Sequence, residues 1–162
     1  MSTPATEPIR RILFATDFSP ASVAAFEYAE RLAVATGAEL LILHALGVTD
    51  FWGSGGDLNR VDEETNQKLS AIKPSLPGVK VERITHRGLP GAVICWLAQD
   101  RNCDQIVMGT HGLTGFAHLV LGSVAEYVVR NARCPVLTVR LPAKKDKPLE
   151  EPEEYPPIPP II

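Results

Sequence analysis

The sequence is poor in cysteine, and its cysteines are not arranged as a recognisable motif. Cys95, Cys103 and Cys134 are odd in number, and none of them forms a Cys-x-x-Cys pair. Such spacing favours neither a disulfide framework nor a zinc knuckle. We therefore expect reduced thiols in a cytoplasmic protein.

Long apolar runs and an excess of basic charge are also missing. Residues 1–11 lack the apolar segment of a signal peptide, and the aliphatic runs are far shorter than a membrane-spanning helix. The chain carries 19 acidic and 16 basic residues, for a net charge of −3. A nucleic-acid-binding protein would show a basic stripe instead. We expect neither a membrane nor a nucleic-acid partner.

Two common phosphate-binding motifs and the usual helical metal pair are absent from the sequence. It contains no G-x-x-x-x-G-K-[ST] and no G-x-G-x-x-G, and no lysine lies between Lys80 and Lys144. No two histidines have the i, i+4 spacing of a helical metal site. We therefore predict no dedicated protein metal site and no catalytic lysine for phosphoryl transfer.

Apolar strand-like and amphipathic helix-like segments alternate along the chain. With 162 residues, 45% of them hydrophobic, the chain is long enough for one domain with an ordinary core. Such alternation predicts the α/β class, as a single doubly wound five-stranded parallel sheet with helices on both faces. We expect strands at 11–16, 39–45, 79–86, 104–108 and 135–139, and helices at 20–36, 57–72, 90–102 and 123–132.

The first helix has clear start and stop signals. Ser19 is a good N-cap residue, and Pro20 fits the first helical position because its missing N–H has no intrahelical partner there. Gly37 follows the last helical residue, where a left-handed backbone is common. These signals predict a helix that ends directly before Gly37.

Proline is concentrated at the C-terminal end. Seven of the 14 prolines lie in residues 142–162, together with several glutamates. This composition cannot build a core, so we expect a domain over 1–141 and a tail over 142–162. Residues 155–162, Tyr-Pro-Pro-Ile-Pro-Pro-Ile-Ile, favour polyproline II. We expect this segment to lie along the surface of a second subunit; the alternatives are a tether and a peptide ligand for another protein.

The segment after the fourth predicted strand is the richest candidate for a ligand site. In open parallel sheets, ligands bind beyond the carboxyl ends of the strands. Gly109 and Gly112 would let the backbone approach a ligand, and the N–H groups of 122–124 form an anion site at a helix start. Strand-to-helix loops also use glycine merely to turn, so the residues alone leave both interpretations open.

The pattern Gly109-x2-Gly112-x9-Gly122-Ser123 resembles the nucleotide-binding signature of the ATP-binding universal stress proteins. Residues 9–140 are similar to that family, because further segments match in order. They are Ile-Leu-Phe-Ala-Thr-Asp-Phe-Ser, Leu-Ile-Leu-His, Gly88-x-Pro90, Ile-Val-Met-Gly-Thr-His-Gly and Cys-Pro-Val-Leu-Thr-Val. The ordered set is far more specific than any one motif.

The resemblance implies the strand order 3-2-1-4-5 and an ATP site that carries Mg²⁺ or Mn²⁺ with the nucleotide. It implies an adenine pocket lined by Ala15, Thr16, Asp17 and Ala45. It also implies that Met108 and Gly109 contact adenine and ribose. The residues that would contact the phosphates are Gly112, Gly122, Ser123 and Val124. His111, within the glycine loop, is a further candidate for phosphate contact.

Several of these residues also have purely structural interpretations. Asp17 could cap the first helix, and Ser123-Val-Ala-Glu126 reads as a capping box. Both roles are compatible with ligand contact. His111 and His118 could be ordinary surface histidines, and His44 at the end of an apolar strand is best explained as a hydrogen-bonded core residue.

The leading functional hypothesis is an ATP-binding universal stress protein that acts as a nucleotide-dependent switch or partner-binding module with little or no hydrolysis. The alternatives are a nucleotide-free interaction module of the same fold and a slow ATPase. The family often dimerises through its fifth strand, so we predict a homodimer through strand 134–140, with Val136, Leu137 and Val139 available to the second subunit. An unidentified protein partner is also expected.

Overall fold

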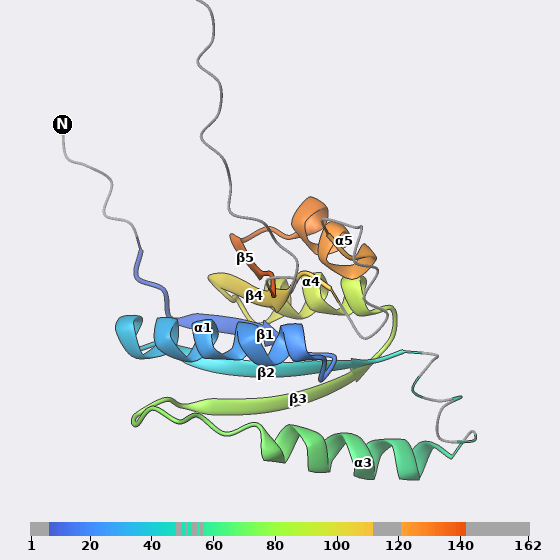
Figure 1. Ribbon diagram of the computed structural model, residues 1–162. Coiled ribbons are helices and arrows are strands. Elements are labelled where there is room, and N and C mark those ends of the chain that lie inside the picture. Colours follow the sequence, from blue (N-terminus) through green and yellow to red (C-terminus); the bar gives the residue numbers. More distant parts are fainter. Residues whose placement is uncertain are drawn as a thin grey trace, which may run out of the picture.

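Strands and helices alternate along the chain as expected. The computed structural model describes residues 7–47, 50, 52, 55, 57–111 and 121–141. The strands are β1 (Arg11–Ala15), β2 (Glu39–Leu46), β3 (Val81–Arg87), β4 (Gln105–Gly109) and β5 (Val136–Val139). The helices named here are α1 (Pro20–Thr36), α3 (Leu58–Ala71), α4 (Pro90–Asp100) and α5 (Ser123–Asn131), as labelled in Figure 1.

The strands form one parallel sheet of order β3-β2-β1-β4-β5. Ile12 of β1 is in register with Leu40 of β2 on one side and with Gln105 of β4 on the other. The direction of strand addition therefore reverses at β1, and the carboxyl ends of β1 and β4 lie side by side. This topology confirms the predicted fold class and strand order.

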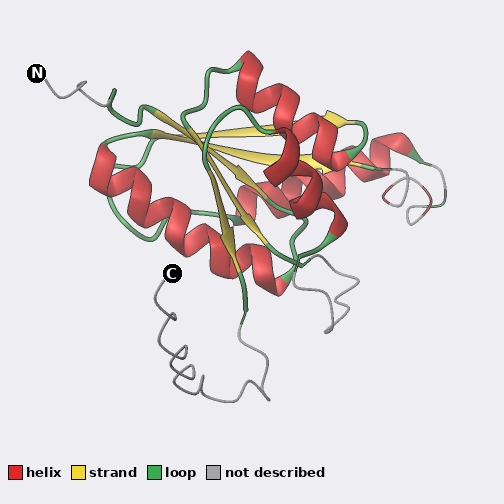
Figure 2. Cartoon of the chain, turned by 90° about the horizontal axis from the view of Figure 1, so that it is seen from above, coloured by secondary structure: helices red, strands yellow, loops and turns green. Residues whose placement is uncertain are grey.

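Helices cover both faces of the sheet, as Figure 2 shows from above. Ile12 and Phe14 of β1 pack with α1 and α3, whereas Leu13 and Ala15 pack with α4 and α5. Successive side chains of a strand point to opposite faces, so central strands such as β1 and β2 need apolar residues at nearly every position to be buried on both sides. The uninterrupted apolar runs of the sequence have this physical cause.

The signals at the ends of α1 act as predicted. The Ser19 side chain accepts a hydrogen bond from the Ser22 N–H, and Pro20 occupies the first turn. Gly37 has φ 72°, and its N–H donates to the Ala33 carbonyl. A left-handed residue at this position is why glycine ends the helix.

The three cysteines pack in or against the core between the sheet and helices α4 and α5. All three are free thiols. Burial raises the pKa of Cys103 to about 11, and burial also raises the pKa values of Cys95 and Cys134. The thiols therefore stay protonated at neutral pH and behave as small apolar side chains.

Strand β5 lies at one edge of the sheet, as the dimer hypothesis requires. The expectation that Val139 is available to a partner is wrong, since this side chain is only 8% exposed and packs in the core beside α1. Val136 and Leu137 are half-buried within the subunit. Dimerisation through strand 134–140 stays a prediction.

Some predictions fall on residues that the structure does not describe. They concern Gly112, His118, most of the 53–56 loop and the tail at 142–162. The division into a domain at 1–141 and a tail stays a prediction for the same reason.

Candidate functional site

The turn between β1 and α1 forms one wall of the candidate site. Thr16 is buried, and its Oγ1 accepts a hydrogen bond from the Phe18 N–H at 2.9 Å and bonds the Ser22 hydroxyl at 2.9 Å. Asp17 Oδ1 accepts from the Ser19 N–H at 3.0 Å. Asp17 therefore orders the turn before α1, whereas the side chain that caps the helix is that of Ser19.

Phe18, in the middle of this turn, has a left-handed backbone with φ 63°. For a bulky residue this conformation costs about 1–3 kcal/mol and needs compensating contacts. Its ring lies 4.5 Å from the His44 ring, centroid to centroid, and Lys68 Nζ lies 5.5 Å from the Phe18 centroid. Stacking and cation–π contacts offset the backbone strain.

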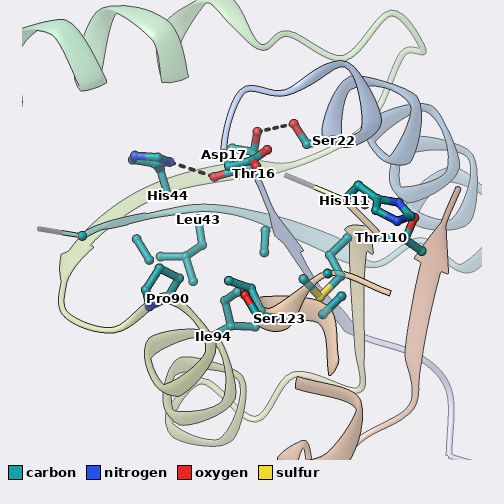
Figure 3. A pocket seen from close by; sticks show the side chains of 18 of the residues that line it. Thr16, Asp17, Ser22, Leu43, His44, Pro90, Ile94, Thr110, His111 and Ser123 are labelled. Atoms are coloured by element: carbon teal, nitrogen blue, oxygen red, sulfur yellow. Dashed lines mark hydrogen bonds between the residues drawn. The ribbon is translucent and has the colours of Figure 1, made fainter. Parts of the chain in front are cut away.

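His44, at the end of β2, is buried and hydrogen-bonded, as expected for a core histidine. Its Nδ1 donates to the Thr16 carbonyl at 2.8 Å, and its Nε2 lies 3.7 Å from Asp50 Oδ1. Asp50 Oδ2 accepts from the Gly47 N–H at 2.7 Å. The first of these bonds ties the ends of β1 and β2 together at the site (Figure 3).

The start of α5 forms the opposite wall, and it differs from the expectation. The N-cap is Gly122, no side chain of the described residues caps the helix, and Ser123 is the first helical residue. The predicted Ser123–Glu126 capping box is therefore wrong, and Glu126 instead pairs with Arg130 at 2.9 Å. The N–H groups of the first turn, from Ser123 to Ala125, have no intrahelical acceptor.

Between these walls lies a cleft of about 440 Å³, a volume typical of small-molecule sites. It opens at the carboxyl ends of β1, β2 and β4. Every predicted site residue that lies in the described part of the chain lines it: Ala15, Thr16, Asp17, Ala45, Met108, Gly109, His111, Gly122, Ser123 and Val124. The remaining predicted residue, Gly112, lies outside the described residues.

Two of the predicted glycines have a packing reason beside any ligand role. A Cβ on Gly109 would lie 2.9 Å from the Ala21 carbonyl carbon, and a Cβ on Gly122 would lie 2.8 Å from the Thr110 carbonyl oxygen. The Gly122 N–H donates to that same oxygen at 2.6 Å. These glycines let α1 and the start of α5 approach the end of β4.

The sequence reasoning missed part of the lining. The missed residues are Ser22, Leu43, His44, Gly47, Asp50, Pro90, Ile94, Thr110 and Ala125. Pro90 was visible in the Gly88-x-Pro90 motif, and Ile94 lies one turn further along α4. Arg87, at the end of β3, pairs with Asp62 of α3 at 2.8 Å and is not among the residues that line the cleft.

Within 7–47, 50, 52, 55, 57–111 and 121–141, no three side chains of His, Cys, Asp or Glu gather as a metal site. None of the helices in these same ranges is long and apolar enough to span a bilayer.

Fold and cleft together define a doubly wound α/β protein with a small-molecule cleft where the strand order reverses. Residues 8–140 match the sequence model of the universal stress protein family. The chain belongs to this family.

Individual relatives agree with the family match. Universal stress protein MJ0531 of Methanocaldococcus jannaschii is 34% identical over 144 residues, which span 84% of this chain and 85% of the relative. The solved structure of MJ0577 from the same organism has a TM-score of 0.76 and 30% identity, and the match covers 85% of this chain and all of that one. A universal stress protein solved in complex with cAMP has a TM-score of 0.59 and 26% identity over 83% of this chain and 98% of that one.

Proposed function

We propose that this protein binds an adenine nucleotide, ATP with Mg²⁺ or Mn²⁺, in the cleft between the β1–α1 turn and the start of α5. In this proposal it acts as a cytoplasmic, nucleotide-dependent stress-response switch or partner-binding module. The observation that carries the proposal is convergence: residues from the ends of β1, β2 and β4 and from the start of α5 line one cleft. The relative solved with cAMP supports a nucleotide as the class of ligand.

The chemistry of the two walls supports a direction for the nucleotide. Leu43, Ala45 and Ile94 provide apolar surface at the β2 end, which suits a base. At the other end the first-turn N–H groups of α5 and the helix dipole favour an anion. We therefore assign adenine to the side of Ala15–Asp17 and Ala45, ribose to Met108 and Gly109, and phosphates to Gly112, Gly122–Val124 and His111.

The charges around the cleft support binding without fast hydrolysis. No lysine or arginine is among the described residues that line it. Phosphoryl transfer needs cations aimed at the γ-phosphate and a group that orients water. In this proposal the phosphates are neutralised by backbone N–H groups and by the divalent ion that the nucleotide brings.

Calorimetry with Mg-ATP and two substitutions at one position tests the phosphate assignment. Ser123→Asp places a carboxylate where the phosphates are proposed, while Ser123→Asn has nearly the same size without the charge. We expect the aspartate variant to bind ATP at least about tenfold more weakly than the asparagine variant, which is about 1.4 kcal/mol. Adenosine, which has no phosphate, should bind both variants alike.

Three outcomes would contradict the proposal or its parts. No binding of ATP or cAMP at millimolar concentration would favour the nucleotide-free interaction module. Equal ATP affinity of the two Ser123 variants would remove the phosphates from the start of α5. Phosphate release above a buffer control, lost in Asp17→Ala or His111→Ala while binding remains, would establish a slow ATPase.

We also propose a homodimer through strand 134–140, supported by the position of β5 at the sheet edge. Light scattering at micromolar concentration measures the mass directly. A monomeric mass would contradict this assembly and leave the nucleotide proposal untouched.

A further inference from the structure

An exposed aromatic and apolar surface lies on α4, away from the cleft. Leu89 is 75% exposed and Trp96 is 51% exposed, and Ala92 between them is exposed as well. The spacing 89, 92, 96 places these residues along one side of the helix. The ring of His86, from strand β3, packs 5.0 Å from the ring of Trp96. We call these four residues the Trp96 surface.

The Trp96 surface is separate from the cleft and from the core. Pro90 and Ile94 of the same helix line the cleft, as Figure 3 shows. Val93 and Leu97 are buried against the sheet. Neither the fold nor the proposed nucleotide site therefore explains why a tryptophan and a leucine are exposed on this side of α4.

We infer that the Trp96 surface is the docking site of the proline-rich end of the same chain, residues 155–162. This segment reads Tyr-Pro-Pro-Ile-Pro-Pro-Ile-Ile. Proline-rich segments lose little entropy on binding because polyproline II is already favoured, and they bind to surfaces lined by aromatic rings. Trp96 and His86 supply such rings, and Leu89 and Ala92 supply the apolar surface beside them.

The order of charges along the chain agrees with this docking. From the sheet edge at β5, α5 comes first because it contacts β5, and α4 comes next because it contacts α5 and β2. Arg133 and Arg130 lie at the C-terminal end of α5, both exposed, although Arg130 also pairs with Glu126. In the tail, the acidic run Glu-Glu-Pro-Glu-Glu at 150–154 directly precedes 155–162. The acidic run can thus face the arginines of α5 when the proline-rich end reaches α4.

The tail is long enough for this path. Residues 142–154 number 13, and at about 3.1 Å per residue they span about 40 Å. The strands β5 and β3 lie at opposite sheet edges, four strand spacings or about 19 Å apart. Tethering also gives the segment a high effective concentration at its own surface.

Tryptophan fluorescence in the full-length protein tests the docking. The chain has two tryptophans, so Trp52→Phe leaves Trp96 as the only reporter. In this background, glycine replaces Pro156, Pro157, Pro159 and Pro160, which removes the polyproline preference. The matched control replaces Pro142 and Pro148, which lie outside the docking segment. We expect acrylamide quenching of Trp96 to rise at least about twofold in the first variant and to stay unchanged in the control.

Two outcomes would overturn the inference. Acrylamide could quench Trp96 equally in three proteins: the one with an unsubstituted tail, the docking-segment variant and the control. This result would show that residues 155–162 do not cover Trp96. If the protection of Trp96 from acrylamide disappears on dilution from micromolar to nanomolar protein, residues 155–162 dock on a second copy of the chain and not on their own. A Trp96→Phe background, where Trp52 reports, should show no effect of the proline substitutions.

Discussion

The two walls of the cleft are built from different hydrogen-bonding groups. At the β1–α1 turn, side chains of Thr16, Asp17 and Ser19 accept hydrogen bonds from the backbone within three residues. At the start of α5 the N–H of Gly122 donates to the Thr110 carbonyl, and none of the side chains that the structure describes caps the helix. The polar groups of the β1–α1 turn therefore bond one another, whereas the start of α5 keeps N–H donors that a ligand can use.

Because of this difference, the cleft can be rigid on one side and still offer hydrogen-bond donors to a ligand on the other. The β1–α1 turn fixes the shape of the cleft on the side proposed for adenine, although the backbone at Phe18 is strained. The uncapped wall provides N–H groups and a helix dipole on the side proposed for the phosphates. Substitutions at the two walls should consequently differ in whether they lower stability or ligand affinity.

The largest effect is expected from a side chain at Gly122. Because a Cβ there would lie 2.8 Å from the Thr110 carbonyl oxygen, Gly122→Val should lower the free energy of unfolding by about 3 kcal/mol through overpacking. Ser123→Val is the matched control, since it adds the same side chain one residue later at an exposed position. Urea unfolding measures both, and equal stability of the two variants would contradict the close approach.

The second effect concerns Thr16. Thr16→Val keeps the shape but removes the acceptor of the Phe18 N–H, so we expect a loss of about 2 kcal/mol in unfolding free energy. Ser22 keeps a partner because its hydroxyl also donates to the Ser19 carbonyl. Thr85→Val, at an exposed position of β3, should change stability little. If both valine variants unfold at the same urea concentration, the turn is not stabilised by its own side chains.

The third effect compares the two helix starts directly. Ser19→Ala removes a side-chain cap and should cost about 1 kcal/mol. Ser123→Ala removes a hydroxyl that caps nothing, and should cost less than about 0.5 kcal/mol. Thermal unfolding of the pair checks the ranking, and a reversed order would show that Ser123 does cap α5 in solution.

The smallest effect has the opposite sign. Ser123→Asp places a negative charge in the first turn of α5 and should raise the unfolding free energy by about 0.3 kcal/mol at low salt. This increase in unfolding free energy should become smaller as sodium chloride is added, because salt screens the interaction between the exposed carboxylate and the helix dipole. A stability loss in this variant would mean that its weaker ATP binding reports on folding instead of on phosphate repulsion.

Most of the fold could be predicted because its signals are local. The apolar run within 11–16 predicts a buried strand, which the structure places at Arg11–Ala15, and Ser19, Pro20 and Gly37 mark the ends of α1. The position of the site also followed from topology, since residues after β1, β2 and β4 must meet where the strand order reverses.

What could not be predicted depends on tertiary approach. Ile94 lines the cleft only because α4 packs beside it, and no periodicity reveals that contact. The capping box failed because the backbone of Gly122 already has N-cap geometry, with φ −70° and ψ 159°, so Ser123 lies inside the helix. The left-handed backbone of Phe18 also had no sequence signal, because bulky residues rarely adopt it.

The central place of β1 has a consequence for synthesis on the ribosome. β1 is the first strand to emerge, yet it pairs with β4, whose Gln105 lies far along the chain. At roughly 5 to 20 residues per second, the ribosome needs roughly 3 to 12 seconds to travel from the end of β2 to the end of β4. Throughout that interval the most apolar strands of the nascent protein have one open edge, so chaperone binding during translation should be strongest before β4 emerges.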